Sequence, residues 1–206
     1  MTNQPINNLQ LIKPILNFSN KGDFYMVYIM QRKKYQPLDR QNEHQSVRTV
    51  KSYCIDSLEY LDKRWNEIIQ LAELFKARVY IAVNKQNHYD ISLLMMEALA
   101  KRINSNIHNQ KNLFDSVVGS VKLKEKRWIV DIDTKDLNEL NEVNKFIDSL
   151  QPIQTESKIL ETVPTPNGYH FLTTKFDVKQ FVDKYPQHEI KKKNPTLLYY
   201  PKSLTK

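Results

Sequence analysis

The sequence has little cysteine, little glycine and no long hydrophobic run, and each scarcity excludes a class of protein. Its single cysteine, Cys54, excludes an internal disulfide and a zinc site built on several cysteines. Its three glycines, at positions 22, 119 and 168, cannot form the Gly-rich phosphate loop of a Walker or Rossmann nucleotide site. Each glycine is therefore expected at a position where the backbone requires one.

The hydrophobic runs are far shorter than the roughly 20 residues that cross a bilayer, and the N-terminus lacks the features of a secretory signal. We therefore expect a cytoplasmic protein with no membrane partner. The 206 residues suffice for one large domain or for two small lobes. A formal net charge of +8 favours polyanionic partners, because Lys and Arg placed against phosphates release condensed counterions.

The first half of the chain predicts an N-terminal α/β lobe over residues 1–117. Aromatic and β-branched residues favour strands over 23–32, 47–55 and 78–84. Apolar residues at a spacing of three or four predict two helices, which begin at Asp56 or Ser57 and at Asp90. The polar stretch 104–117 is expected to be a lobe boundary or an exposed loop.

The second half, residues 118–206, predicts strands and helices in the order β-α-β-β-α-β. The elements are expected at 127–133, 136–150, 157–163, 169–175 and 177–184, with "HEIKK" and "TLLYY" as final strand candidates. This is the split βαβ order of ferredoxin-like and RRM-like folds. The expected fold class is therefore α+β, with an RRM-like lobe following the N-terminal α/β lobe.

Two aspartates stand at the end of the first of these strands, in the stretch "WIVDID". Asp131 and Asp133 are two residues apart, so on a strand their side chains point to the same face. Paired carboxylates at this spacing are suited to Mg²⁺, which proteins bind through one or two carboxylates together with substrate phosphates. The alternative is that the two aspartates end the strand and cap the following helix.

A histidine follows a glycine turn in the stretch "TPNGYHFL". His170 is expected on a strand close to the first one, with its side chain on the same open face as Asp131 and Asp133. In that position it could donate a hydrogen bond to a phosphate oxygen or take part in proton transfer. The alternative is a structural histidine with a hydrogen-bond partner inside the sheet.

These two motifs resemble those of the archaeo-eukaryotic primase and primase-polymerase superfamily. That family joins an RRM-like catalytic palm to an N-terminal α/β lobe, and its first two motifs look like "WIVDID" and "TPNGYHFL" here. The resemblance implies that Asp131 and Asp133 bind catalytic Mg²⁺ or Mn²⁺ and that His170 contacts the triphosphate of the incoming nucleotide. It covers about residues 120–200 by motif and element order.

The sequence departs from the family at its third motif, which is an acid on a later strand. The corresponding stretch, "EIKKKNPTLLYY", offers Asn194 instead of an aspartate, while Glu189 lies upstream. Lys192 and Lys193 of the same stretch are suited to phosphate contacts, so the residues expected to bind the nucleotide are His170, Lys192, Lys193 and Asn194. Asp177 is better explained as a helix cap.

The leading hypothesis is therefore a primase-polymerase-like nucleotidyltransferase that uses nucleoside triphosphates, a nucleic-acid template and primer, and a divalent metal. Unwinding would then fall to a separate helicase. Without an evident third acid, a catalytically inactive RRM-like protein that binds nucleic acid or nucleotides is the alternative. A structural or regulatory α/β protein, in which the two aspartates are caps, is a third.

Overall fold

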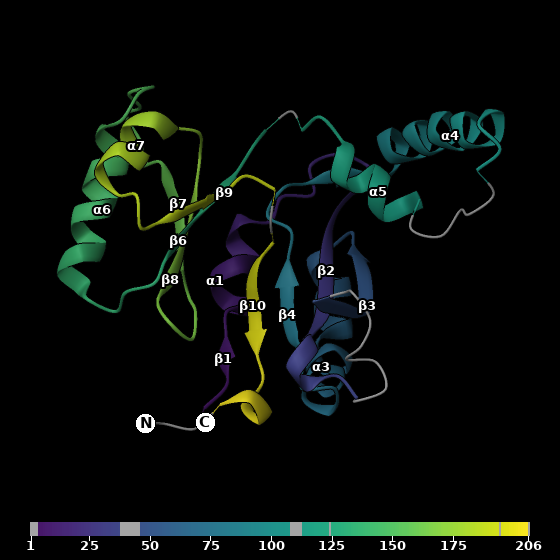
Figure 1. Cartoon of the computed structure of the whole chain (residues 1–206), viewed down its shortest axis with the longest axis horizontal. Coiled ribbons are helices and arrows are strands. Elements are labelled where there is room, and N and C mark those ends of the chain that lie inside the picture. Colours follow the sequence, from purple (N-terminus) through teal and green to yellow (C-terminus); the bar gives the residue numbers. More distant parts are fainter. Residues whose placement is uncertain (1–3, 38–45, 108–112, 124, 194, 206) are drawn as a thin grey trace.

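The chain forms two antiparallel sheets with helices, an α+β architecture (Figure 1). A computed structural model describes residues 4–37, 46–107, 113–123, 125–193 and 195–205. Within these ranges no helix has both the length and the apolar character needed to cross a membrane. The two sheets differ in size, and each has its own helices.

The larger sheet combines strands from the first half of the chain with the last strand of the chain. Its order is β1 (Ile6–Asn7), β10 (Thr196–Tyr200), β4 (Arg78–Ile81), β2 (Asp23–Arg32) and β3 (Val47–Ile55), and β5 (Gln86–Asn87) pairs with β2. Short 3-10 turns lie at Lys13–Ile15, Lys33–Tyr35 and Lys202–Leu204. All pairings in this sheet are antiparallel.

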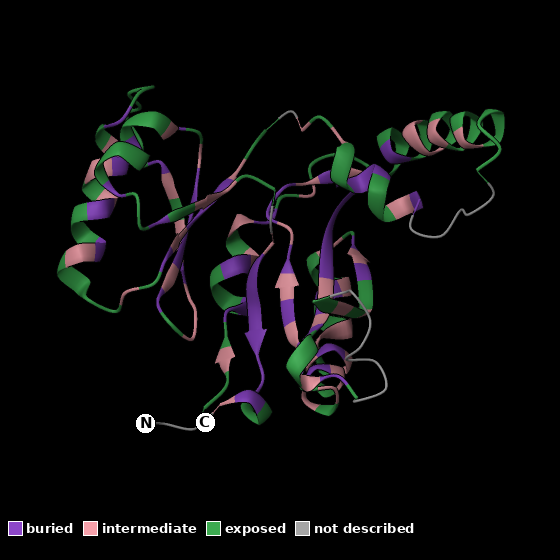
Figure 2. Cartoon of the chain, viewed as in Figure 1, coloured by how far each residue is buried: buried purple, intermediate pink, exposed green. Residues whose placement is uncertain are grey.

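The alternation of side chains along β2 determines which helices cover each face of the larger sheet. Val27 and Ile29 share a core with α1 (Leu9–Ile12) and α3 (Leu58–Leu74). Phe24 and Met26, which point to the other face, pack with α4 (His88–Asn104) and α5 (Leu113–Ser120). Buried residues accordingly dominate the central strands β2 and β10 of this sheet (Figure 2).

The smaller sheet has the order β7-β8-β6-β9. Its elements follow one another as β6 (Trp128–Ile132), α6 (Leu137–Ser149), β7 (Ile159–Pro164), β8 (Tyr169–Thr173), α7 (Val178–Lys184) and β9 (Glu189–Lys191). The expected β-α-β-β-α-β order is therefore present in residues 128–191. Asp136 and Asp177 cap α6 and α7, because their side chains accept hydrogen bonds from the first turns of these helices.

The two faces of the smaller sheet have different partners. Val130 and Ile132 of β6 belong to a core formed with α6 and α7. Ile129 of the same strand, together with Val163 and Leu172, belongs instead to the core of the larger sheet. The face of β6 that carries Ile129 and Asp131 is therefore turned toward the rest of the molecule.

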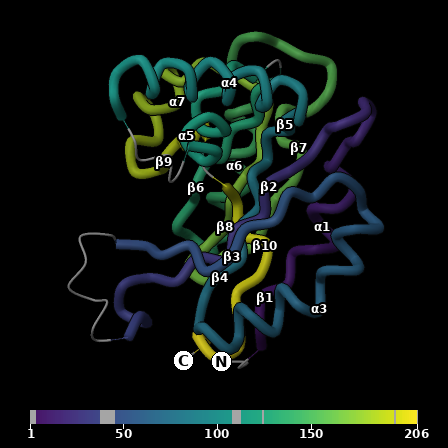
Figure 3. The backbone as a smooth tube through the Cα atoms, turned by 90° about the vertical axis from the view of Figure 1, so that its right-hand side faces the viewer, coloured from purple at the N-terminus to yellow at the C-terminus, as the bar shows by residue number. Residues whose placement is uncertain are grey.

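Three expectations from the sequence require correction. The candidate strand "TLLYY" is β10, but it pairs with β1 and β4 of the larger sheet and so does not close the smaller one (Figure 3). Residues 113–117, expected in a loop, lie in α5 and bury Leu113 and Val117. The second long helix, α4, begins at His88 and is capped by Asn87, so Asp90 lies in its first turn.

Candidate functional site

Three strands of the smaller sheet bring polar side chains into one row. Asp131 on β6 is the register partner of His170 on β8 and, on its other side, of Glu189 on β9. Residues directly opposite each other in antiparallel strands point to the same face. Asp131, His170 and Glu189 therefore lie side by side on the face turned toward the larger sheet.

The Asp131 carboxylate is held by two basic groups. Its Oδ1 lies 3.3 Å from Nε2 of His170, and its Oδ2 forms an ion pair with Nζ of Lys191. The hydrogen bond from His170, supported by Lys191 and opposed by burial, lowers the pKa of Asp131 to about 2. Asp131 is therefore ionised at neutral pH, with both of its oxygens engaged.

Lys191 on β9 lies between Asp131 of β6 and Glu189 of its own strand. Its ammonium lies 3.3 Å from Oε2 of Glu189, so a single cation lies between two carboxylates. Burial acts to lower the pKa of Lys191, but its contacts with Asp131 and Glu189 outweigh this effect and raise it. The ammonium thus occupies a position suited to a cation.

His170 joins the two sheets through its second ring nitrogen. Its Nδ1 lies 3.0 Å from Oγ1 of Thr196 on β10, and both residues are buried. When Nε2 carries the proton and donates it to Asp131, Nδ1 can accept the hydroxyl proton of Thr196. The alternative of a structural histidine with a partner inside its own sheet is therefore only partly met: Thr196 lies on the other sheet, and the neighbour within the sheet is Asp131.

Asp133 lies just beyond the end of β6 and is exposed. Gly168 packs closely against the backbone on either side of Asp133, since a Cβ at residue 168 would lie 2.0 Å from the carbonyl oxygen of Ile132 and 2.8 Å from the nitrogen of Thr134. Within the described residues, no hydrogen bond or ion pair joins Asp133 to Asp131, His170 or Lys191. Of the three residues expected to converge, the structure brings Asp131 and His170 together and leaves Asp133 in solvent.

The lysines expected to contact phosphates make other contacts. The ammonium of Lys192 lies 5.0 Å from the centre of the Trp128 ring. Lys193 donates a 3.0 Å hydrogen bond to the carbonyl oxygen of Gly119, and both lysines are exposed. Asn194 lies outside the described residues.

Sequence reasoning missed the role of Lys191 and understated that of Glu189. Both belong to the stretch "EIK", in which the first and third residues share a face once it forms a strand. That spacing was a usable signal. The spacing alone does not single out Lys191, because Lys191 is the first of three consecutive lysines and only the pairing of β9 with β6 distinguishes it from the others.

The oxygen ligands at this site have the chemistry that Mg²⁺ and Mn²⁺ prefer. However, no group of three His, Cys, Asp or Glu side chains in the described ranges is arranged to bind a metal. Asp131 and Glu189 fit a divalent cation chemically, since an ammonium already bridges their two carboxylates. Metal binding would require Lys191 to move away from Asp131.

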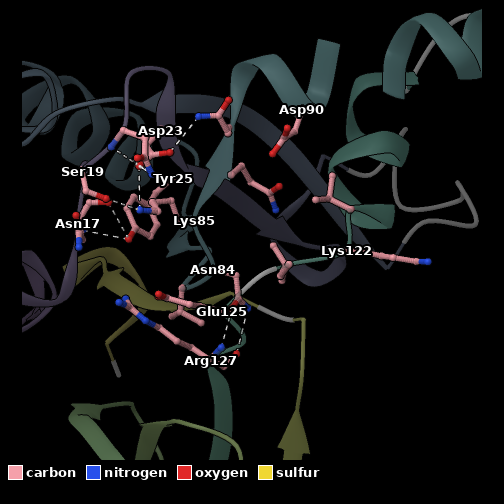
Figure 4. A pocket seen from close by; sticks show the side chains of 16 residues that line it. Asn17, Ser19, Asp23, Tyr25, Asn84, Lys85, Asp90, Lys122, Glu125 and Arg127 are labelled. Atoms are coloured by element: carbon pink, nitrogen blue, oxygen red, sulfur yellow. Dashed lines mark hydrogen bonds and ion pairs between the residues drawn. The ribbon is translucent and has the colours of Figure 1, made fainter. Parts of the chain in front are cut away.

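A separate polar pocket of about 440 Å³ lies where the chain enters β6 (Figure 4). Asp23, Asn84, Lys85 and Arg127 line it, and Asp131, His170 and Asp133 do not. The Asn84 side chain accepts from the backbone nitrogen of Arg127 and donates to its carbonyl oxygen. Asp23 forms a 2.9 Å ion pair with Lys85, so these four lining residues are already paired with one another.

Comparisons of the chain with protein-family models, with curated proteins and with solved structures find no match.

Proposed function

We propose that the protein is a primase-polymerase-like nucleotidyltransferase that uses a divalent metal, nucleoside triphosphates and a nucleic-acid template and primer. One observation carries this proposal: Asp131 and His170 are direct cross-strand neighbours on the first and third strands of a β-α-β-β-α-β unit. The sequence resemblance assigns metal binding and triphosphate contact to these two positions.

The topology of the smaller sheet supports an RRM-like palm. Numbered within the unit, its strands have the spatial order 2-3-1-4, in which the first and third strands are central. This is the order expected for a split βαβ fold. The face that bears Asp131 is turned toward the larger sheet, so a substrate there would lie between the two halves of the protein.

We further propose that Glu189 supplies the third acid that the sequence did not reveal. It stands on the strand after the second helix of the unit and opposite Asp131, on the far side from His170. Asp131, Asp133 and Glu189 would then hold Mg²⁺ or Mn²⁺, and Lys191 would turn toward a phosphate. A lysine ammonium is ordinarily charged at neutral pH, so Lys191 can make that contact as a cation.

The proposed reaction is attack of a primer 3′-oxygen on the α-phosphorus of a nucleoside triphosphate. A bond forms between the 3′-oxygen and that phosphorus, the bond to the β-phosphate oxygen breaks, pyrophosphate leaves, and the hydroxyl proton passes to solvent. When bound, the divalent metal supplies charge stabilisation for the attacking and leaving oxygens. His170 would donate a hydrogen bond to the triphosphate, and Lys191 would neutralise part of its charge.

The position of Lys191 favours a second candidate function, non-catalytic binding of nucleic acid or nucleotides. With its ammonium on Asp131, the site has no free carboxylate pair and the protein keeps its surplus of +8. A polyanion would then bind through surface cations, with a steep dependence on salt.

One pair of measurements on the 206-residue chain distinguishes the two candidates. Primed template is incubated with labelled nucleotides and Mn²⁺ or Mg²⁺, using wild type and the double variant Asp131→Asn/Asp133→Asn, while fluorescence anisotropy reports template binding. If the protein is a nucleotidyltransferase, wild type should extend the primer, and the double variant should lose extension while still binding the template. Salt-sensitive binding without extension on any template would establish the second candidate instead.

A further inference from the structure

The His170 ring lies between a carboxylate of its own sheet and a hydroxyl of the other sheet. Its Nε2 is 3.3 Å from Oδ1 of Asp131, and its Nδ1 is 3.0 Å from Oγ1 of Thr196. Thr196 is 0% exposed and His170 is 8% exposed, so water has little access to the contact between them. Both nitrogens of the ring are therefore engaged by protein groups.

The direction of the hydrogen bond between Thr196 and His170 follows from the donors and acceptors present. The Asp131 carboxylate is ionised and can only accept, so Nε2 carries a proton and Nδ1 of the neutral ring is left as an acceptor. The Thr196 hydroxyl has a proton to donate, and among the described residues its hydrogen-bond partner is the His170 ring. Because buried polar groups are nearly always hydrogen-bonded, the hydroxyl donates to Nδ1.

We infer that Thr196 is a positioning residue, whose hydroxyl donates to Nδ1 of His170 and holds the ring with its Nε2–H directed toward the Asp131 side of the site. The nitrogen of a histidine that carries the proton is set by the hydrogen bond that the other nitrogen makes. The catalytic consequence rests on the proposed function: the Nε2–H would be aimed at the place where the triphosphate binds. The hydrogen bond itself does not depend on that function.

Thr196 can hold the ring because its own strand is anchored at this point. It is the first residue of β10, which pairs with β4 of the larger sheet. The buried amide of Asn8 donates to the carbonyl oxygens of Leu197, the next residue, and of Pro164 on β7. The hydroxyl therefore comes from a strand that is tied to both sheets, and the direction of the His170 ring depends on how the two sheets pack.

Three substitutions isolate the hydroxyl. Thr196→Val keeps the branched shape and removes the hydroxyl, while Thr196→Ser keeps the hydroxyl. Thr173→Val is the matched control, because Thr173 on β8 is also 0% exposed and its hydroxyl has no hydrogen-bond partner among the described residues. If the inference holds, Thr196→Ser and Thr173→Val should leave the His170 ring as it is in wild type, and Thr196→Val should not.

The ring is observed directly by long-range ¹⁵N–¹H correlation of the histidine side chains at about pH 8, where an imidazole is ordinarily neutral. The His170 signals are identified by their loss in His170→Gln. In wild type we expect Nε2 protonated and Nδ1 unprotonated with the shift of a hydrogen-bond acceptor. In Thr196→Val the Nδ1 signal should move toward that of an unprotonated nitrogen without a donor. A protonated Nδ1 in wild type, or unchanged His170 signals in Thr196→Val, would overturn the inference.

The catalytic consequence is tested by single-turnover extension of a primed template. Thr196→Val should slow extension about 10-fold or more with template binding unchanged, because small misplacements of a contacting group are costly to the rate, and Thr196→Ser should restore it. Equal rates for wild type and Thr196→Val, or an equally slow Thr196→Ser, would overturn this consequence. If wild type itself gave no extension, the proposed function would fail, and the nitrogen signals of His170 would still decide whether Thr196 positions the ring.

Discussion

At the residue scale, the candidate site is defined by the two basic groups that neutralise the Asp131 carboxylate. The carboxylate contacts His170 on one side and Lys191 on the other, and its own side chain is only 19% exposed. The sequence predicted that Asp131 and His170 lie close together, because turn-forming residues mark the ends of the two strands that carry them. It could not predict which of three consecutive lysines faces Asp131, since that depends on the register between β6 and β9.

The lowered pKa of Asp131 predicts a pH-dependent contribution to stability. Because this pKa is about 2 in the folded protein and about 3.9 in an unfolded chain, the stabilisation is fully present above about pH 4 and is lost as the pH falls toward 2. Asp131→Asn should therefore lower the free energy of unfolding by roughly 2 kcal/mol at pH 7. Urea titrations from pH 7 to pH 2 should show this difference shrinking, and exposed Asp133→Asn should change stability by less than about 0.5 kcal/mol. A difference for Asp131→Asn that stays constant with pH would contradict the assignment.

Removing the ammonium between Asp131 and Glu189 should favour a metal at the same place. Lys191→Met keeps much of the side-chain volume and frees both carboxylates. We expect Mn²⁺ affinity, measured by electron paramagnetic resonance, to rise about tenfold, equivalent to ~1.4 kcal/mol. Lys192→Met is the matched control, because Lys192 lies over Trp128. Equal affinities in wild type, Lys191→Met and Lys192→Met would exclude exchange of Lys191 for the metal.

The glycines provide a matched pair of substitutions. Gly168→Ala places a methyl group 2.0 Å from the backbone oxygen of Ile132, where no flexible side chain can yield. We expect a loss of about 3 kcal/mol or more in the free energy of unfolding. A Cβ at Gly119 of α5 meets nothing within 4 Å, so the backbone requirement expected for every glycine is wrong at this position. Gly119→Ala should therefore stabilise the helix by about 0.5–1 kcal/mol. Thermal and urea unfolding of the two variants will compare them, and equal effects would contradict the close approach at Gly168.

At the scale of elements, local patterns predicted α3, α6 and α7 well, but they missed α5 and did not give the partner of the last strand. The apolar periodicity of α3 and α6 and the caps Ser57, Asp136 and Asp177 are properties of short segments. The strand β10 is buried at all five positions, so its composition is equally compatible with either sheet. Its pairing with β4 joins residues far apart in the sequence, so no local sequence pattern predicts it.

Asn8 ties the two sheets together at this point. Its buried side-chain amide donates to the carbonyl oxygens of Pro164 on β7 and Leu197 on β10, at 2.9 and 3.0 Å. Asn8→Ala leaves both acceptors without this donor and should lower the free energy of unfolding by about 2–3 kcal/mol. Exposed Asn66→Ala on α3 is the control and should not destabilise. Similar urea midpoints for Asn8→Ala and wild type would show that water replaces the amide.

At the scale of the whole molecule, the chain passes between its two halves twice, once into β6 and once from β9 into β10. The polar row of Asp131, His170 and Glu189 lies on the face of the smaller sheet that meets the larger half. Substrate, cations and the contact from His170 to Thr196 would therefore share one interface, so we expect ligand binding to be coupled to the packing of the two sheets.

The most direct measurement of the central proposal is single-turnover extension of a primed template with Mn²⁺ by wild type, Asp131→Asn, Glu189→Gln and Glu142→Gln. Glu142 lies exposed on α6 and serves as the matched control for Glu189. We expect extension by wild type and Glu142→Gln, and a loss of about 100-fold or more in the other two variants, since even outer-shell partners of metal ligands contribute 10- to 100-fold. No extension by wild type on any template, or full activity in Asp131→Asn, would contradict the proposal.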